Sequence, residues 1–136
     1  MKKFSLFILI IITSLSCREE IIQPGNFVEN INDPVQINEP NSFTLLLNAQ
    51  SFSMNLSVPA YFNSNRVRFN VTMIDYNSGY ISIAVQDYEE KERFRYFTSE
   101  DVSFYSDVLD GYVPKTISIR TEKLSGKLKV EFRKTL

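Results

Sequence analysis

The chain of 136 residues contains no histidine, no tryptophan, a single cysteine and only four glycines. Histidine is the commonest general base and the commonest metal ligand, so its absence removes much acid–base and zinc chemistry. One thiol excludes a disulfide within the chain and a thiolate zinc site. No P-loop, dinucleotide-binding or G-x-S-x-G motif occurs either. We therefore expect no catalytic residues, no enzyme activity and no cofactor.

The charged residues give no indication of a nucleic-acid partner. Without the first 16 residues, which hold two lysines and no acid, the chain has 13 basic and 16 acidic residues, a net charge of −3. A nucleic-acid-binding domain usually carries a basic stripe instead. The remaining chain is long enough for one domain, and its 13% aromatic content argues against disorder.

The first 17 residues, MKKFSLFILIIITSLSC, have the organisation of an export signal. Two lysines precede a short apolar run that only Ser5 interrupts, and small and polar residues then lead to Cys17. The run is about half of the roughly 20 apolar residues that cross a bilayer. A basic start, a short apolar centre and a small-residue exit are typical of a secretory signal peptide. In the simpler alternative the peptide is cleaved and Cys17 is an ordinary residue.

This stretch resembles the signal peptides of bacterial lipoproteins, in which small residues before a cysteine (the lipobox) direct lipid onto that cysteine. Ser16 and Cys17 match the pattern, whereas Ser14 stands where the family usually has leucine and Leu15 falls one place late. The resemblance implies a signal peptide over residues 1–16 and several acyl chains on Cys17. The anchor makes the membrane a partner of the protein. Several acyl chains make it stable, because one acyl chain alone holds a protein to a membrane only marginally.

The residues that follow the cysteine, Arg18-Glu19-Glu20, resemble the export signals of surface lipoproteins in Bacteroidetes-type bacteria. A merely solvated tether explains them equally well. The resemblance places the protein at the bacterial outer membrane, lipid-anchored and facing either the periplasm or the cell surface. We expect the lipidated cysteine and a flexible tether over residues 17–33 and one folded domain over residues 34–136.

The folded part shows alternation of apolar and polar residues with period two, which is the pattern of half-buried strands. Eight runs follow this pattern, at residues 35–37, 42–49, 52–58, 67–73, 81–85, 94–97, 116–122 and 127–133. Short strands at such spacing, with turn signals between them, predict an all-β fold. We expect an antiparallel β-sandwich of immunoglobulin-like or jelly-roll kind, with a small closed β-barrel as the alternative.

Two of the connections predict hairpins. The segments Tyr76-Asn77-Ser78-Gly79 and Leu124-Ser125-Gly126 contain residues that accept left-handed dihedrals. They predict hairpins that join run 67–73 to run 81–85 and run 116–122 to run 127–133. Around residues 48–51, by contrast, the apolar positions change from odd to even where no glycine occurs. A bulge or kink in one long strand is favoured there over a tight turn.

One segment departs from strand periodicity. Val102, Tyr105, Val108 and Leu109 have roughly helical spacing, and acidic residues precede them. This pattern predicts a short helix or helical turn near residues 99–109. A short strand through the same segment is the alternative.

The aromatic residues that fall in loops or at strand ends are Tyr61, Phe62, Tyr76, Tyr80, Tyr88 and Tyr112. The candidate ligand-binding residues among them are Tyr61, Phe62 and Tyr112. Exposed rings in such places stack on sugars or anchor a protein partner. The alternative is that these rings cap the ends of the core.

The candidate metal ligands are weaker. Asp87, Glu89 and Glu90 lie in one charged tip and offer oxygen ligands to Ca²⁺, but without the spacing of an EF-hand. A solvated loop is the simpler explanation of this cluster.

These observations favour a membrane-anchored envelope or surface lipoprotein. Its non-catalytic β-sandwich would act as a binding or structural module for a protein or a glycan. The alternatives are a carbohydrate-binding accessory module and a small hydrolase that uses two carboxylates.

Overall fold

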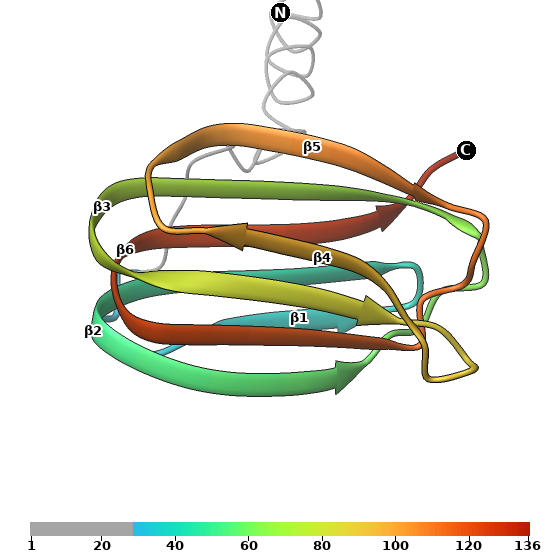
Figure 1. Cartoon of the computed structure of the whole chain (residues 1–136), viewed down its shortest axis with the longest axis horizontal. Coiled ribbons are helices and arrows are strands. Elements are labelled where there is room, and N and C mark those ends of the chain that lie inside the picture. The colour runs from blue at the N-terminus through green and yellow to red at the C-terminus, as the bar shows by residue number, and fades with distance from the viewer. Residues whose placement is uncertain (1–28) are drawn as a thin grey trace, which may run out of the picture.

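The computed structural model describes residues 29–136, so the signal peptide and Cys17 lie outside the described residues. The described chain contains strands and connecting loops but no helix (Figure 1). The strands are β1 (Val35–Glu39), β2 (Ser42–Pro59), β3 (Arg66–Gln86), β4 (Glu92–Thr98), β5 (Val102–Asp110) and β6 (Thr116–Lys134). Every strand pairing is antiparallel. The predicted all-β class is confirmed.

Three long strands pass through the whole molecule. β6 lies between β2 and β3 and pairs with both along nearly its full length. The three strands bend together at one end, on the left in Figure 1, so that their two halves form two layers. We call layer one the sheet formed by residues 42–49, 126–134 and 66–74 with β1 and β5 at its edges. Layer two contains residues 52–59, 116–124 and 78–86 with β4. The sheet does not close into a barrel, and the antiparallel β-sandwich is the observed architecture.

The bend is built from bulges and left-handed residues. Backbone φ is positive at Ser51 in β2 (49°), at Asp75 and Gly79 in β3 (55° and 83°) and at Lys123 in β6 (46°). The pairing registers shift at the same places, between residues 49 and 54 and between residues 74 and 80. An extra residue on one strand kinks that strand and increases its twist. The bulge or kink predicted at residues 48–51 is therefore confirmed.

The two predicted hairpins are wrong. Residues 67–73 and 81–85 belong to the single strand β3, and residues 116–122 and 127–133 belong to the single strand β6. The left-handed residues of the expected turns do lie where the chain folds back (Figure 1), but the two halves of each strand lie in different layers and do not pair with each other. Two alternating runs around a flexible segment look the same in the sequence in both cases.

The predicted helix near residues 99–109 is also wrong, because this segment forms β5. Its pairing with β3 contains a register shift, and Val102 lies opposite Met73 while Tyr105 lies opposite Val71. The bulge thus puts two residues three positions apart on the same inward face. Spacing by three is the first element of a helical pattern, which is why the segment resembled a helix.

The core lies between the two layers. Phe43, Phe69 and Phe132 are its largest residues and are fully buried. The ring centroid of Phe69 lies 5.0 Å from that of Phe132, 5.1 Å from that of Phe94 and 5.4 Å from that of Tyr96. Full burial of a side chain of this size contributes roughly 1.5–3 kcal/mol. Phe94 and Tyr96 are residues of β4, so these ring contacts extend the core from β3 and β6 to β4.

The segment before β1 is fastened to the bend of β2. The Asn32 side-chain amide donates to the carbonyl oxygen of Gln50 (3.1 Å), and the Gln50 amide donates to Asn32 Oδ1 (2.8 Å). Ile31 forms an isolated parallel bridge with Asn48. The last residues of the expected tether, 29–33, therefore include a contact with the sandwich.

The glycines allow a test of how tightly the strands pack at the bend. Gly79 and Gly111 both have positive φ, 83° and 87°. A Cβ on Gly79 would overlap the backbone carbonyls of Glu122 and Lys123, whereas a Cβ on Gly111 would meet nothing within 4 Å. We expect Gly111→Ala to cost about 1 kcal/mol through backbone strain alone. We expect Gly79→Ala to cost about 3 kcal/mol or more, because overpacking adds to the same strain.

The free energy of unfolding in urea measures both effects. Equal losses in the two variants would show that the backbones of β3 and β6 do not approach each other closely at Gly79.

Candidate functional site

Polar, charged and aromatic side chains from four strands come together on the outer surface of layer two. Residues directly opposite each other in an antiparallel sheet lie on the same face. One such row runs across the sheet from Phe97 to Ser82, Arg120 and Asn55. The neighbours of Ser82, Ile81 and Ile83, are fully buried, so the row points away from the core.

A second row lies parallel to the first and runs from Arg95 to Ala84, Ser118 and Ser57. Tyr80 and Glu122 lie opposite each other in a third row nearer the bend. We call this surface the layer-two face. It consists of Asn55, Ser57, Tyr80, Ser82, Ala84, Arg95, Phe97, Ser118, Arg120 and Glu122.

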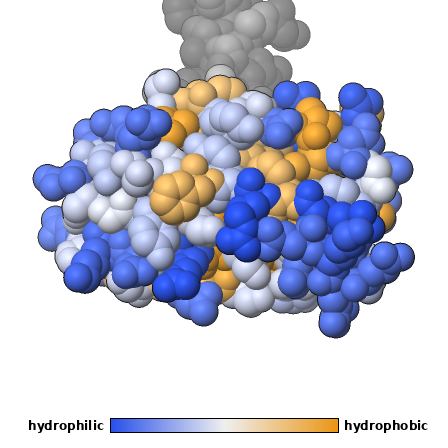
Figure 2. Space-filling model, in the orientation of Figure 1, coloured by the Kyte–Doolittle hydropathy of each residue, from blue (hydrophilic) through white to orange (hydrophobic). Residues whose placement is uncertain are grey.

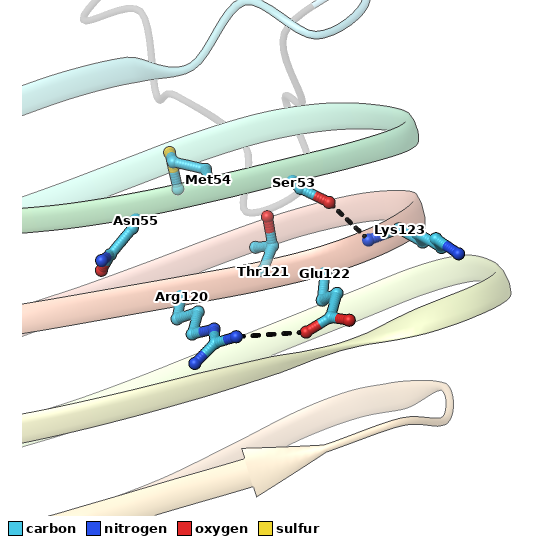
Figure 3. A pocket seen from close by; sticks show the side chains of 7 residues that line it. All are labelled: Ser53, Met54, Asn55, Arg120, Thr121, Glu122 and Lys123. Atoms are coloured by element: carbon cyan, nitrogen blue, oxygen red, sulfur yellow. Dashed lines mark hydrogen bonds and ion pairs between the residues drawn. The ribbon is translucent and has the colours of Figure 1, made fainter.

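The layer-two face is hollowed. Small residues form its centre, where a depression of about 150 Å³ is lined by Asn55, Arg95, Arg120 and the small side chains of Ser82, Ala84 and Ser118. A larger open hollow of about 610 Å³ shares Asn55 and Arg120 with it and extends to the bend. Figure 3 shows the larger hollow, with Arg120 and Glu122 side by side on β6 and Asn55 on β2. The two hollows therefore lie next to each other, and we call them together the groove.

Arg95 is held in place by a two-fold contact with a carboxylate. Its Nε donates to Glu92 Oε1 (2.8 Å) and its Nη2 donates to Glu92 Oε2 (2.6 Å). This hydrogen bonding lowers the pKa of Glu92 and raises the pKa of Arg95. Fork-to-fork pairs of this kind fix the plane of the guanidinium. Arg95 is thus oriented at the wall of the depression, with 61% of its side chain still exposed.

Arg120, Glu122 and Tyr80 form a second network. Arg120 Nη2 lies 3.3 Å from Glu122 Oε2, and the Tyr80 hydroxyl donates to the same oxygen over 2.6 Å. The hydrogen bond from Tyr80 is the main reason why the pKa of Glu122 is lowered, and the same bond raises the pKa of Tyr80. At neutral pH Glu122 is therefore an ionised acceptor and Tyr80 a neutral donor.

Phe97 forms an exposed aromatic surface beside this network. Its ring centroid lies 5.3 Å from that of Tyr80, with an angle of 36° between the rings, and 57% of the residue is exposed. On the side of the molecule drawn in Figure 2 most of the surface is hydrophilic, and apolar surface is confined to limited areas between charged side chains. An exposed ring fixed among charged groups is a suitable platform for a ligand with both apolar and polar faces.

The three aromatic candidates from the sequence do not form such a platform. Tyr61 is 56% exposed, but Phe62 beside it belongs to the core with 5% exposed. Tyr112 is half-buried, and within residues 29–136 its hydroxyl group finds no hydrogen-bond partner. Burial raises the pKa of Tyr112 to about 12. Phe62 therefore fits the alternative that these rings cap the end of the core, and the buried half of Tyr112 fits it as well.

The calcium candidates are engaged in the turn that contains them. Asp87 is buried, and its Oδ1 accepts hydrogen bonds from the backbone amides of Glu89 (2.9 Å) and Lys91 (3.0 Å). Its Oδ2 accepts a hydrogen bond from Arg93, which is the main reason why the pKa of Asp87 is lowered. Glu89 lies near the same arginine. In the part of the chain that the structure describes, no group of three or more His, Cys, Asp or Glu residues is placed to hold a metal ion.

Of the residues of the layer-two face, only Tyr80 belongs to the aromatic residues noted from the sequence, and it was not one of the three candidates. One further signal was available. Phe97 falls on the polar phase of its run, together with Arg93 and Arg95, while Phe94 and Tyr96 occupy the apolar phase. An aromatic residue on the polar phase of a strand points away from the core. Its position beside Tyr80 depends on the strand pairing, which the sequence does not reveal.

Comparison with known proteins adds no family to this description. No protein-family model matches the chain, and no curated protein matches it significantly. Among residues 29–136 there is no helix with the length and apolar character needed to cross a membrane.

Asp87 generates a prediction on the pH dependence of stability. Its pKa is lower in the folded chain than its ordinary value of 3.8, so the stability it provides is complete above that pH and is lost as the pH falls through the folded value. We expect Asp87→Asn to be less stable than the unmodified protein at neutral pH. The difference in unfolding free energy should shrink as the pH falls from about 4 to about 2.

The matched control is Glu90→Gln, in the same tip, because Glu90 is exposed and its nearest cation is Lys115 at 3.4 Å. A difference for Asp87→Asn that stays constant down to about pH 2 would contradict the role of its ionised form.

Tyr112 and Tyr80 generate an opposed pair of predictions. The buried hydroxyl of Tyr112 has no hydrogen-bond partner in the described part of the chain, so Tyr112→Phe should leave the unfolding free energy unchanged or raise it by up to about 1–2 kcal/mol. Tyr80→Phe removes the hydrogen bond to Glu122 and should lower the melting temperature. Thermal unfolding of both variants checks this order. If Tyr112→Phe destabilises the protein and Tyr80→Phe does not, the Tyr112 hydroxyl has a hydrogen-bond partner in solution.

Proposed function

We propose that the chain is a lipid-anchored protein of the bacterial envelope whose β-sandwich is a non-catalytic binding module. The layer-two face is its binding surface. The binding surface is inferred from the groove, which is lined by oriented charged groups and small residues, and from the exposed ring of Phe97, which lies beside the groove opposite Ser82. Ligand sites commonly combine a concave surface with a few fixed polar groups in this way.

The protonation of the carboxylates supports binding over catalysis. A general acid requires a carboxyl group whose pKa is raised towards neutrality. The pKa values of Glu92 and Glu122 are both lowered, by the hydrogen bonds from Arg95 and Tyr80 respectively. Both groups are therefore ionised acceptors at neutral pH. Such groups orient a ligand but have no proton to donate to a leaving group.

The N-terminal sequence supports the anchor. The first 16 residues and Cys17 resemble a lipoprotein signal peptide and its lipidated cysteine, and Ile31 forms a bridge with Asn48 of the sandwich. The chain from Cys17 to Ile31 reaches at most about 50 Å when fully extended. An anchor of this length would keep the sandwich near the membrane and still allow the layer-two face to meet ligands in the surrounding space.

Lipidation is tested directly by metabolic labelling with an alkyne analogue of palmitate. We expect the full chain to incorporate the label and to partition into the detergent phase of a Triton X-114 extraction. Cys17→Ser should lose the label, because no other thiol is present. Ser14→Leu, which brings the lipobox closer to the family pattern, should be labelled at least as well.

A wild-type chain that carries no label and has a free thiol at Cys17 after export would contradict the anchor. The plain cleaved signal peptide would then be the better description.

A further inference from the structure

We propose that the layer-two face binds a neutral carbohydrate chain. Phe97 provides the stacking surface, and Arg95, Arg120, Glu122 and Asn55 provide hydrogen bonds around the groove. This inference rests on the proposed binding function and names the class of ligand.

The balance of charge favours a neutral ligand. Each arginine of the face has a carboxylate partner, Glu92 for Arg95 and Glu122 for Arg120. The positive and negative charges within each pair therefore cancel. Lys123 at the rim of the larger hollow adds one positive charge. A phosphate or carboxylate ligand would meet two anions as well as two cations, and little net attraction would result.

The same pairs present donors and acceptors together, which suits sugar hydroxyl groups. A guanidinium has five N–H donors, and a carboxylate has about four acceptor sites, so neither partner is saturated by the other. The hydrogen bond that joins Arg120 to Glu122 uses one nitrogen of the arginine, and the side chain is 62% exposed. A hydroxyl group both donates and accepts, and therefore can bridge the two partners of such a pair. Asn55 adds an amide with both functions across the groove.

The aromatic platform is fixed before any ligand arrives. The exposed ring of Phe97 rests against Tyr80, and the Tyr80 hydroxyl is held by Glu122 over 2.6 Å. One face of a pyranose ring consists mainly of C–H groups and packs on an aromatic ring as an apolar surface. Because the ring is already oriented, binding does not incur the entropy loss of ordering this side chain. Phe97 therefore suits a sugar better than a freely rotating surface residue would.

The shape of the groove fits an extended ligand. The face crosses four strands, and three inter-strand spacings give a width of about 14 Å. Serine and alanine side chains form the floor, so a ligand can approach the sheet closely between Arg95 and Arg120. The larger hollow lies next to the depression, because Asn55 and Arg120 line both, and it extends to the bend. A short run of linked sugar rings matches two neighbouring hollows better than a single compact molecule does.

Affinity electrophoresis of the full lipidated protein in a non-sugar detergent tests the inference. Native gels contain either a neutral polysaccharide (xylan, mixed-linkage β-glucan or galactomannan) or the acidic polygalacturonate. We expect retardation by at least one neutral polysaccharide that persists at high salt, and none by polygalacturonate. Phe97→Ala and Arg120→Ala should each weaken the retardation by about tenfold in apparent dissociation constant. Ser82→Tyr, which fills the depression from an outward position, should abolish it.

Matched controls lie on other surfaces. Phe104 on β5 is 65% exposed, so Phe104→Ala removes a ring of similar exposure. Arg68→Ala removes an exposed arginine between the buried residues Val67 and Phe69, which places it on the outer side of layer one. Both variants should be retarded like the unmodified protein. Circular dichroism melting confirms that each variant is folded before its mobility is compared.

Three outcomes would overturn the inference. They are no retardation by any neutral polysaccharide, retardation by polygalacturonate alone, and unchanged retardation of both Phe97→Ala and Ser82→Tyr. A photo-crosslinker at position 82 then distinguishes a failure of the carbohydrate inference from a failure of the proposed binding function. Crosslinking of an envelope protein there, without sugar binding, would reject the carbohydrate and keep the binding module. Absence of the palmitate label from the wild-type chain would reject the anchor, whatever the results of these binding experiments.

Discussion

The shared bend of β2, β6 and β3 is the constraint on which the rest of the structure depends. Because β6 pairs with a neighbour on each side along nearly its whole length, none of the three strands can change layer alone. Each strand therefore carries its own irregularity, such as Ser51 in β2, Gly79 in β3 and Lys123 in β6. The bend turns one open sheet into two layers and brings the apolar faces of both halves together.

The same constraint arranges the outer surface of layer two. Once the register of β6 against β2 and β3 is set, Asn55, Arg120, Ser82 and Phe97 must stand in one row. Their order follows from backbone pairing and does not depend on contacts between the side chains. The charge pairs of Arg95 and Arg120 and the hydrogen bond from Tyr80 then fix the side chains on this row. Binding groups placed on rigid strands are positioned more closely than groups on loops.

The sequence predicted the strand content of this fold but not its connections. Period-two alternation identified the buried faces of residues 42–49, 67–73 and 127–133, because alternation depends only on which face is buried. Whether the next run pairs with the previous one or lies in the other layer depends on whether a left-handed residue makes a tight turn or a bulge. Gly79 makes a bulge because β6 runs alongside β3 on both sides of it. That information is tertiary, and a local pattern does not contain it.

The layer-two face could not be predicted from the sequence for the same reason. Tyr61, Phe62 and Tyr112 were selected because loop aromatics are often exposed, yet Phe62 packs into the core. Phe97 and Tyr80 lie 17 positions apart, and only the pairing of β3 with β4 brings their rings together. The charge pair of Arg120 and Glu122 is visible locally, but its place beside Tyr80 requires the register of β6 on β3.

Hydrogen–deuterium exchange of the full protein, with and without oligosaccharides cut from a neutral polysaccharide that retards it, locates the surface on which ligands bind. If they bind on the layer-two face, as we propose, exchange should slow in peptides that cover residues 53–57, 80–84, 95–97 and 118–122. Protection confined to the loop at residues 60–65 or to β5, with these four segments unchanged, would contradict this proposal.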